Sequence, residues 1–157
     1  MKIELWVIGK TSFGYLKEGI ELYQKRLKHY TKFELLVIPD LKNRKKLNEE
    51  QIKTKEGEIL LKKLQNSDFL ILLDENGKSL SSVKFSKYLD QLTLQRHKRV
   101  IFVIGGAYGF SQAIYQKSRA KISLSAMTFS HQMVRLFFVE QLYRAFTISN
   151  NEPYHHQ

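Results

Sequence analysis

Two short loops in the second half of the sequence combine residue types that can hold a small ligand. Residues 105–110 follow a short apolar run and contain three glycines, which let a backbone approach a ligand closely. Residues 124–129 offer the hydroxyl groups of Ser125 and Thr128 beside backbone amides. A pocket with apolar walls and many backbone hydrogen-bonding groups suits an adenine and a ribose better than a free phosphate. The two loops together therefore predict a nucleoside-binding pocket.

Plainer interpretations of these loops stay open. A glycine-rich turn also joins a strand to a helix without binding anything, and Thr128 or Ser130 could simply cap the helix that follows. The glycine spacing does not fit the dinucleotide fingerprint, and the sequence contains no P-loop pattern for phosphate. Two familiar classes of nucleotide site are therefore excluded.

Residues 131–146 place charged side chains at helical spacing in an almost wholly apolar stretch. His131 and Arg135 are four positions apart and share one face of the expected helix, whereas Glu140 and Arg144 share another. We interpret the second pair as an ion pair rather than as catalytic groups. A helix without a solvent-facing stripe must be covered on more than one side, and a second subunit is the expected cover in so short a chain.

The C-terminal residues 150–157 include Tyr154, His155 and His156, which could stack on a base or contact a phosphate. The segment is too short to form an element of its own. Its composition alone favours a frayed terminus.

Apolar runs of strand length alternate with amphipathic helical patterns along the chain. We expect strands over residues 2–8, 33–38, 68–73, 100–104 and 120–124, and helices over residues 15–30, 49–64 (capped by Asn48), 111–118 and 131–146, with a further helix that begins at Ser81 or Ser82. This alternation predicts one α/β domain over residues 1–157, a mostly parallel sheet with helices on both faces. Leu73 then ends a strand at the same sheet edge as the two loops. We expect residues 74–77 to form a polar turn there and residues 41–47 to form a mobile basic loop.

The composition favours a polyanionic partner. The chain has 26 Lys and Arg against 15 Asp and Glu, a formal net charge of +11, so nucleic acid is the leading partner class, and a basic surface kept for solubility is the equal alternative. The absence of cysteine excludes disulfides, a thiolate nucleophile and a Cys-ligated metal. The sequence shows neither a membrane-spanning apolar run nor a signal-peptide pattern, so we expect a cytoplasmic protein without membrane contact.

The chain resembles the RlmH family of SPOUT-class methyltransferases over its whole length. The resemblance rests on residues 2–10, 23–27, 55–57, 102–106 with Gly109, 125–133, 140–145 and 153–155. It departs from the family at His156, where many members carry Arg or Lys.

The resemblance implies a fold, a cofactor and a substrate. Members fold as a parallel sheet with a carboxyl-terminal trefoil knot, form homodimers, need no metal, and methylate N3 of a pseudouridine in 23S ribosomal RNA of the assembled ribosome. The cofactor is S-adenosylmethionine. The residues implied to line its site are Leu73, Gly105, Leu124, Ser125, Ala126, Met127, Thr128 and Phe129.

A sulfonium methyl group is already activated, so catalysis would consist mainly of positioning and of help in losing the imide proton. By resemblance, Arg135 or Arg144 would supply charge and RNA positioning together with residues 154–156. His131 or His155 would accept the proton. Two other readings stay open: a basic RNA-binding module without catalysis, which would not bind S-adenosylmethionine, and a flavodoxin-like or nucleotide-binding protein, which would carry a flavin or a phosphate.

Overall fold

Strands and helices alternate from one end of the polypeptide to the other, as the sequence predicts. The computed structural model describes residues 1–156. In chain order its elements are β1 (Lys2–Ile8), α1 (Gly14–Leu27), β2 (Lys32–Ile38), the 3₁₀ helix η1 (Arg44–Lys46), α2 (Glu49–Lys63), β3 (Phe69–Ser79), α3 (Ser82–Leu94), β4 (Arg99–Ile104), α4 (Gln112–Lys117), β5 (Ala120–Ser123) and α5 (His131–Ser149). No helix among these residues is long and apolar enough to cross a membrane.

The five strands form one parallel sheet in the order β2-β1-β4-β3-β5. This confirms the predicted α/β class. A flavodoxin-like sheet has the order 2-1-3-4-5, so the exchange of β3 and β4 excludes that alternative.

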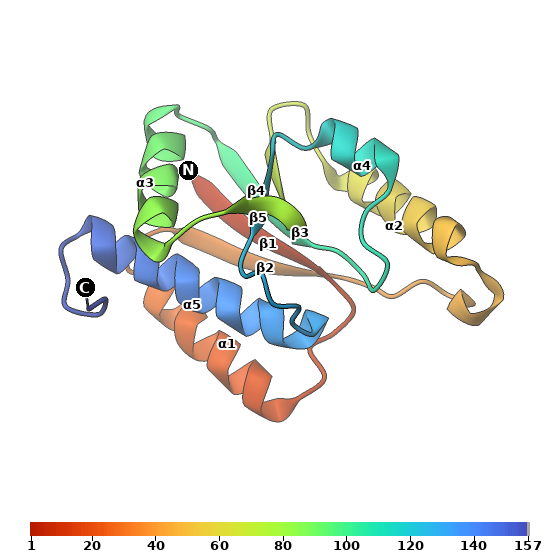
Figure 1. Ribbon diagram of the computed structural model, residues 1–157, viewed down its shortest axis with the longest axis horizontal. Coiled ribbons are helices and arrows are strands. Elements are labelled where there is room, and N and C mark those ends of the chain that lie inside the picture. Colours follow the sequence, from red (N-terminus) through yellow and green to blue (C-terminus); the bar gives the residue numbers. More distant parts are fainter. Residues whose placement is uncertain (157) are drawn as a thin grey trace.

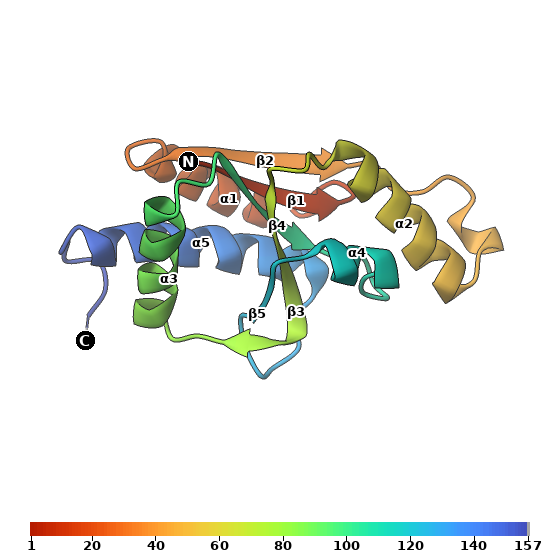
Figure 2. The ribbon, with the colours of Figure 1, turned by 90° about the horizontal axis from the view of Figure 1, so that it is seen from above.

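Both faces of the sheet are covered because its central strands are apolar on both sides. Ile3, Leu5 and Val7 of β1 belong to a buried cluster with α1, α3 and α5. Trp6, which points the other way, belongs to a second cluster with α2 and α4. Figure 1 shows α1 and α5 below the sheet and α2 and α4 above it, and Figure 2 shows the same layers from above.

Two predicted helix caps are confirmed. The Asn48 side chain accepts from the Gln51 amide at 2.8 Å, and the Gln51 side chain accepts from the Asn48 amide at 3.0 Å. Ser130 caps α5 by accepting from the Met133 amide at 3.2 Å. Of the two expected candidates, Ser130 rather than Thr128 starts α5.

The polar residues 74–77 do not form the turn that their composition predicts. They lie within β3, which continues to Ser79 and pairs with β5 on both sides of an irregularity between Leu73 and Lys78. A Cβ atom at Gly77 would lie 2.6 Å from backbone atoms of Ile122, so glycine permits this close approach of the two strands. Local sequence cannot distinguish a turn that ends a strand from a bulge inside one, because both favour Asp, Asn and Gly.

The tail does not fray, which corrects the expectation from composition. The Tyr30 hydroxyl donates to the Glu152 carboxylate at 2.6 Å, and the Tyr154 hydroxyl lies 3.0 Å from the Tyr23 hydroxyl. Both partners lie more than a hundred positions earlier in the chain, so tail composition could not reveal them. Gln157 lies outside the described residues.

Much of the cover on α5 comes from the same chain. Helices α1 and α3 pack along α5 and, with the sheet, bury Phe138, Val139, Leu142 and Ala145. The apolar character of α5 therefore reflects three neighbours within the same chain, namely α1, α3 and the sheet, and only part of its surface is left for a second subunit.

Candidate functional site

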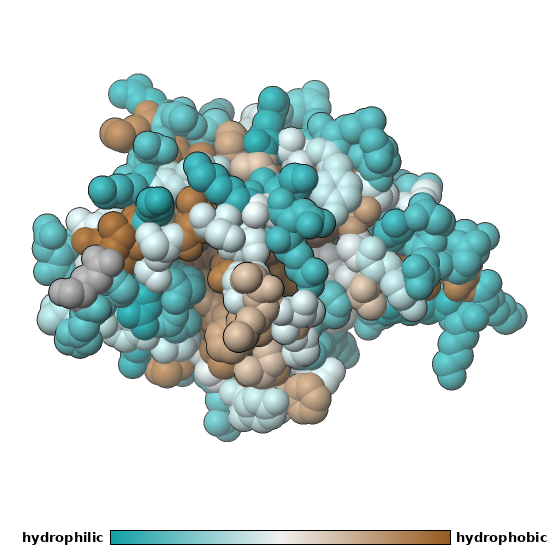
Figure 3. Space-filling view, in the orientation of Figure 1, coloured by the Kyte–Doolittle hydropathy of each residue, from teal (hydrophilic) through white to brown (hydrophobic). Residues whose placement is uncertain are grey.

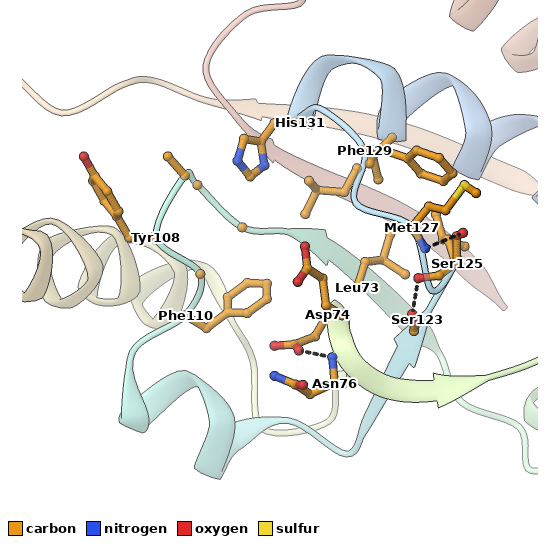
Figure 4. Close-up of a pocket in the computed structure, with 18 of the residues that line it drawn as sticks. Leu73, Asp74, Asn76, Tyr108, Phe110, Ser123, Ser125, Met127, Phe129 and His131 are labelled. Atoms are coloured by element: carbon orange, nitrogen blue, oxygen red, sulfur yellow. Dashed lines mark hydrogen bonds between the residues drawn. The ribbon is translucent and has the colours of Figure 1, made fainter.

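A cavity lies at the carboxyl edge of the sheet, between β3 and β4. The chain leaves β3 toward α3 on one face and leaves β4 toward α4 on the other, so the two connections diverge and leave a crevice. The cavity measures about 390 Å³, within the usual range for small-molecule sites. Its walls, drawn in Figure 4, come from five parts of the chain: residues 73–76, 104–110 and 123–125, Tyr115 of α4, and the start of α5 with the loop before it.

The glycine loop after β4 has a shape that larger residues would disturb. The Gly109 amide donates to the Gly106 carbonyl at 3.1 Å, and Gly109 has a φ of 82°, in the left-handed region. A Cβ atom on Gly106 would lie 2.7 Å from both carboxylate oxygens of Glu56. The loop therefore brings bare backbone to the cavity and packs against α2 on its other side.

The second loop uses its serine hydroxyls to hold its own shape. The Ser123 hydroxyl donates to the Ser125 carbonyl at 2.9 Å, and the Ser125 hydroxyl accepts from the Met127 amide at 2.9 Å, as Figure 4 shows. Of the residues implied by resemblance, those that line the cavity are Leu73, Gly105, Leu124, Ser125, Met127 and Phe129. Ala126 and Thr128 belong to the same loop but do not line the cavity.

An acidic wall faces the two loops. Asp74 accepts from the Asn76 amide at 2.8 Å and from the Tyr115 hydroxyl. Burial, together with this bond to Asp74, raises the pKa of Tyr115 to about 12. Tyr115 therefore stays protonated and donates, which fixes the Asp74 carboxylate at the cavity, beside Glu75.

His131 lies at the first position of α5 and lines the cavity. His131 is exposed overall, but partial burial of its ring, and then the charges of Arg135 and Arg44, lower its pKa from the ordinary 6.5, whereas Glu75 acts in the opposite direction. A neutral imidazole at neutral pH is therefore favoured, and such a group can accept a proton.

Arg135 shares a face with His131 but points elsewhere. Its side chain is fully buried, and its guanidinium donates to the carbonyl oxygens of Gly9 at 2.9 Å and Ile8 at 2.7 Å. It also donates to the Thr11 hydroxyl at 3.1 Å. These contacts tie α5 to the loop between β1 and α1.

The remaining predicted catalytic residues form a separate cluster near the end of α5. Arg144 pairs with Glu140 at 2.5 Å, which confirms the predicted ion pair. The Tyr154 hydroxyl donates to Glu140 at 3.0 Å, and His155 Nδ1 lies 3.1 Å from an Arg144 nitrogen. The pKa of Tyr154 is raised, mainly by burial and then by its hydrogen bonds.

Arg144 follows His131 by 13 positions in one helix, and a rise of about 1.5 Å per residue separates them by roughly 20 Å. Within one chain, the structure thus brings His131 to the cavity and leaves Arg144, Tyr154 and His155 at the other end of α5. Figure 1 shows the tail at that far end.

The fold and the cavity can be set beside known proteins. The family model described as "Predicted SPOUT methyltransferase" matches residues 1–155. The chain belongs to the SPOUT methyltransferase family. This match confirms the family resemblance found in the sequence. It excludes the alternative of a basic RNA-binding module without catalysis.

Several relatives of this SPOUT methyltransferase match it from end to end. "Ribosomal RNA large subunit methyltransferase H" of Parabacteroides distasonis is 59% identical over 157 residues, 100% of both chains. The protein of the same name from Christiangramia forsetii is 60% identical over the same span. That of Cytophaga hutchinsonii is 53% identical over 156 residues, 99% of this chain and 100% of its own.

Sequence reasoning missed several residues that line the cavity of this SPOUT methyltransferase. The sequence predicts a turn at Asp74 and Glu75 and gives them no role, although they directly follow Leu73. Tyr108 and Phe110 lie inside the glycine loop, where aromatic residues among glycines were the available signal. Tyr115 could not be foreseen, because only the packing of α4 brings its hydroxyl to Asp74. Among residues 1–156, no cluster of three or more His, Cys, Asp or Glu is placed to hold a metal ion.

Proposed function

We propose that this SPOUT methyltransferase uses S-adenosylmethionine to methylate N3 of a pseudouridine in 23S ribosomal RNA of the assembled ribosome, in the cytoplasm. Binding of the methyl donor is supported by one observation, the cavity of about 390 Å³ between the diverging connections of β3 and β4. Methylation of ribosomal RNA is supported by relatives at 50–60% identity whose name is "Ribosomal RNA large subunit methyltransferase H".

The cavity residues fit the chemistry of the proposed donor. Leu73, Ile104 and Phe129 provide apolar walls suited to an adenine, and the glycine loop provides bare backbone beside them. The carboxylates of Asp74 and Glu75 suit ribose hydroxyls or a positive charge. When bound, S-adenosylmethionine supplies an already activated methyl group, so these side chains need only bind and orient.

His131 is the proposed proton acceptor. It lies at the cavity, and its lowered pKa keeps the imidazole ring neutral and able to take the imide proton from the acceptor base. Arg144, Tyr154 and His155 are the proposed groups for RNA positioning, held together by Glu140. Arg135 acts indirectly, by fixing the start of α5 against the loop at Gly9.

We also propose a homodimer, which two features of the single chain support. Arg144, which holds the tail residues Tyr154 and His155, lies roughly 20 Å along α5 from His131 at the cavity. The tail and the cavity can therefore serve one site only if a second copy of the chain brings its tail to the cavity. Met127 and Phe137 also leave apolar side chains exposed, 76% and 36% respectively. Figure 3 shows apolar surface gathered around a hollow in the middle of the face where Figure 1 places α5. We further propose that residues 1–157 act as one domain, with the trefoil knot typical of the family around the cavity.

Two measurements test this proposal. Calorimetry should show one S-adenosylmethionine site per chain. Mass spectrometry of 23S ribosomal RNA from cells that lack the protein should show one pseudouridine without its methyl group, restored when the purified protein and S-adenosylmethionine are added to their ribosomes. Normal methylation in such cells would overturn the assignment.

A further inference from the structure

The segment between β2 and α2 carries cations that the proposed donor site does not use. Lys42, Arg44, Lys45 and Lys46, here called the basic segment, lie within five positions, and the three lysines are exposed. Arg44 pairs loosely with Asp40 at 3.9 Å. No carboxylate of the described residues lies within ion-pair distance of the three lysines.

The basic segment has a defined geometry and touches the rim of the cavity. Its last three residues form η1, preceded by Asn43 in the left-handed conformation with a φ of 57°. The Arg44 guanidinium carbon lies 5.8 Å from the centre of the Tyr108 ring, a cation–π contact. Because Tyr108 also lines the cavity, the basic segment and the cavity meet at this residue.

The Tyr108 ring is exposed to solvent and can contact a bound molecule. Its side chain is 43% exposed. Figure 4 shows its ring on the outer side of the glycine loop, away from Asp74 and Ser123. An exposed ring held by a guanidinium is a platform on which an unpaired base can stack.

The charge of Arg44, within the basic segment, shifts the pKa of groups at and beside the cavity. Arg44 is one of the groups that lower the pKa of His131, and it also opposes the rise in the pKa of the buried Glu56. A polyanion held at Arg44 would therefore lie close to His131. RNA phosphates are the complementary charge for a chain of net charge +11.

We propose that the basic segment and Tyr108 hold the RNA strand that flanks the acceptor nucleoside. The lysines contact phosphates, and the Tyr108 ring stacks on an unpaired neighbouring base. This inference rests on the proposed function, because it names the surface by which an RNA methyltransferase presents its acceptor to the cavity.

The first test removes the three exposed charges. The variant Lys42→Gln/Lys45→Gln/Lys46→Gln should raise the KM for ribosomes by about 10-fold or more, with kcat within about threefold and the Kd for S-adenosylmethionine unchanged. Its Kd for a short fluorescent single-stranded RNA should rise equally, and the slope of log Kd against log salt should fall by about 2, roughly 0.7 for each phosphate contact.

A matched control removes the same charge elsewhere. Lys84 and Lys87 of α3, with Lys98 before β4, are exposed, and α3 lies on the opposite side of the molecule from α2 in Figures 1 and 2. The triple Gln variant at these positions should leave both RNA constants within about threefold of the unchanged protein. Equal losses in the two triple variants would show a general charge effect and overturn the inference.

The second test separates stacking from charge. Tyr108→Ala should weaken RNA binding about 10-fold, whereas Tyr108→Phe, which keeps the ring, should stay within about twofold. If Tyr108→Ala instead weakened only S-adenosylmethionine binding, Tyr108 would belong to the donor site and the inference would be wrong.

The outcomes also separate this inference from the proposed function. Unchanged RNA constants in the basic-segment variant, with normal methylation by the original protein, would overturn the inference alone. RNA binding that depends on the basic segment, in a protein that methylates no ribosome, would overturn the proposed function alone.

Discussion

Arg135 Nη1 lies 2.9 Å from the carbonyl oxygen of Gly9, although 126 positions separate the two residues. This bond joins the last helix to the end of the first strand. Because His131 stands one turn before Arg135, the same bond fixes the side chain proposed to accept the proton.

Replacing this buried guanidinium should destabilise the protein strongly. Arg135→Met leaves the carbonyl groups of Ile8 and Gly9 without their charged donor, and we expect a loss of about 2–4 kcal/mol in the free energy of unfolding, measured in urea. Gln132→Ala removes two neutral, exposed hydrogen bonds to the same loop, one donated to the Lys10 carbonyl and one accepted from the Ser12 amide, and should cost only about 1 kcal/mol. Equal stability of Arg135→Met and the unchanged protein would contradict this role.

Glu56 should make the protein less stable as the pH rises. Its side chain is buried, Oε1 has no partner, and burial raises its pKa above the ordinary 4.5, with Asp40 adding to the rise and Arg44 opposing it. A raised folded-state pKa means that the proton bound by Glu56 stabilises the folded protein below pH 4.5 and that this contribution is lost as the pH rises through the raised value.

Glu56→Gln should therefore be more stable than the unchanged protein at pH 7, by about 1 kcal/mol. The difference should shrink as the pH falls toward 4.5. Urea unfolding of both proteins across this range is the measurement, and a difference independent of pH would refute the assignment.

Gly106→Ala should block donor binding through Glu56. The new methyl group would lie 2.7 Å from the Glu56 carboxylate, so the glycine loop must shift. We expect S-adenosylmethionine affinity, measured by calorimetry, to fall at least about 10-fold. Gly14→Ala, where nothing lies within 4 Å, is the control and should leave affinity unchanged. Adding Glu56→Ala to Gly106→Ala should restore part of the affinity, and no rescue would argue against this contact as the cause.

The pH dependence of kcat/KM should show the protonation of His131. We expect kcat/KM to fall only as the pH drops below 6.5, because burial, Arg135 and Arg44 keep the imidazole pKa below that value. His131→Gln should lower the rate about 100-fold and abolish this acidic limb. A variant that retained the limb would assign the titration to another group.

Mixed dimers should reveal whether the tail acts across subunits. Chains carrying Tyr154→Ala and His155→Ala, and chains carrying Gly106→Ala, should each methylate ribosomes poorly. Co-expressed, they should recover up to about a quarter of normal activity, because half of the dimers contain one site with an intact cavity and an intact tail. Absence of recovery would mean that the tail serves its own chain.

The sequence predicted the strands, the helices and the cavity loops because these depend on local periodicity and turn chemistry. Two predictions from the sequence, the turn at residues 74–77 and the frayed terminus, are wrong for the same physical reason. Residues 74–77 continue strand β3 instead of ending it in a turn, and residues 150–156 dock instead of fraying, because pairing with β5 and contact with Tyr23 decide these outcomes from far along the chain.

The sequence by itself determined the α/β class, the family, and the placement of the Gly105 and Leu124 loops at one sheet edge. Only the tertiary structure decided the strand order, the acidic wall at Asp74, and the separation of His131 from Arg144 along α5. The physical reason is that periodicity records which faces of an element are buried, whereas the choice of neighbours is made by packing between distant segments.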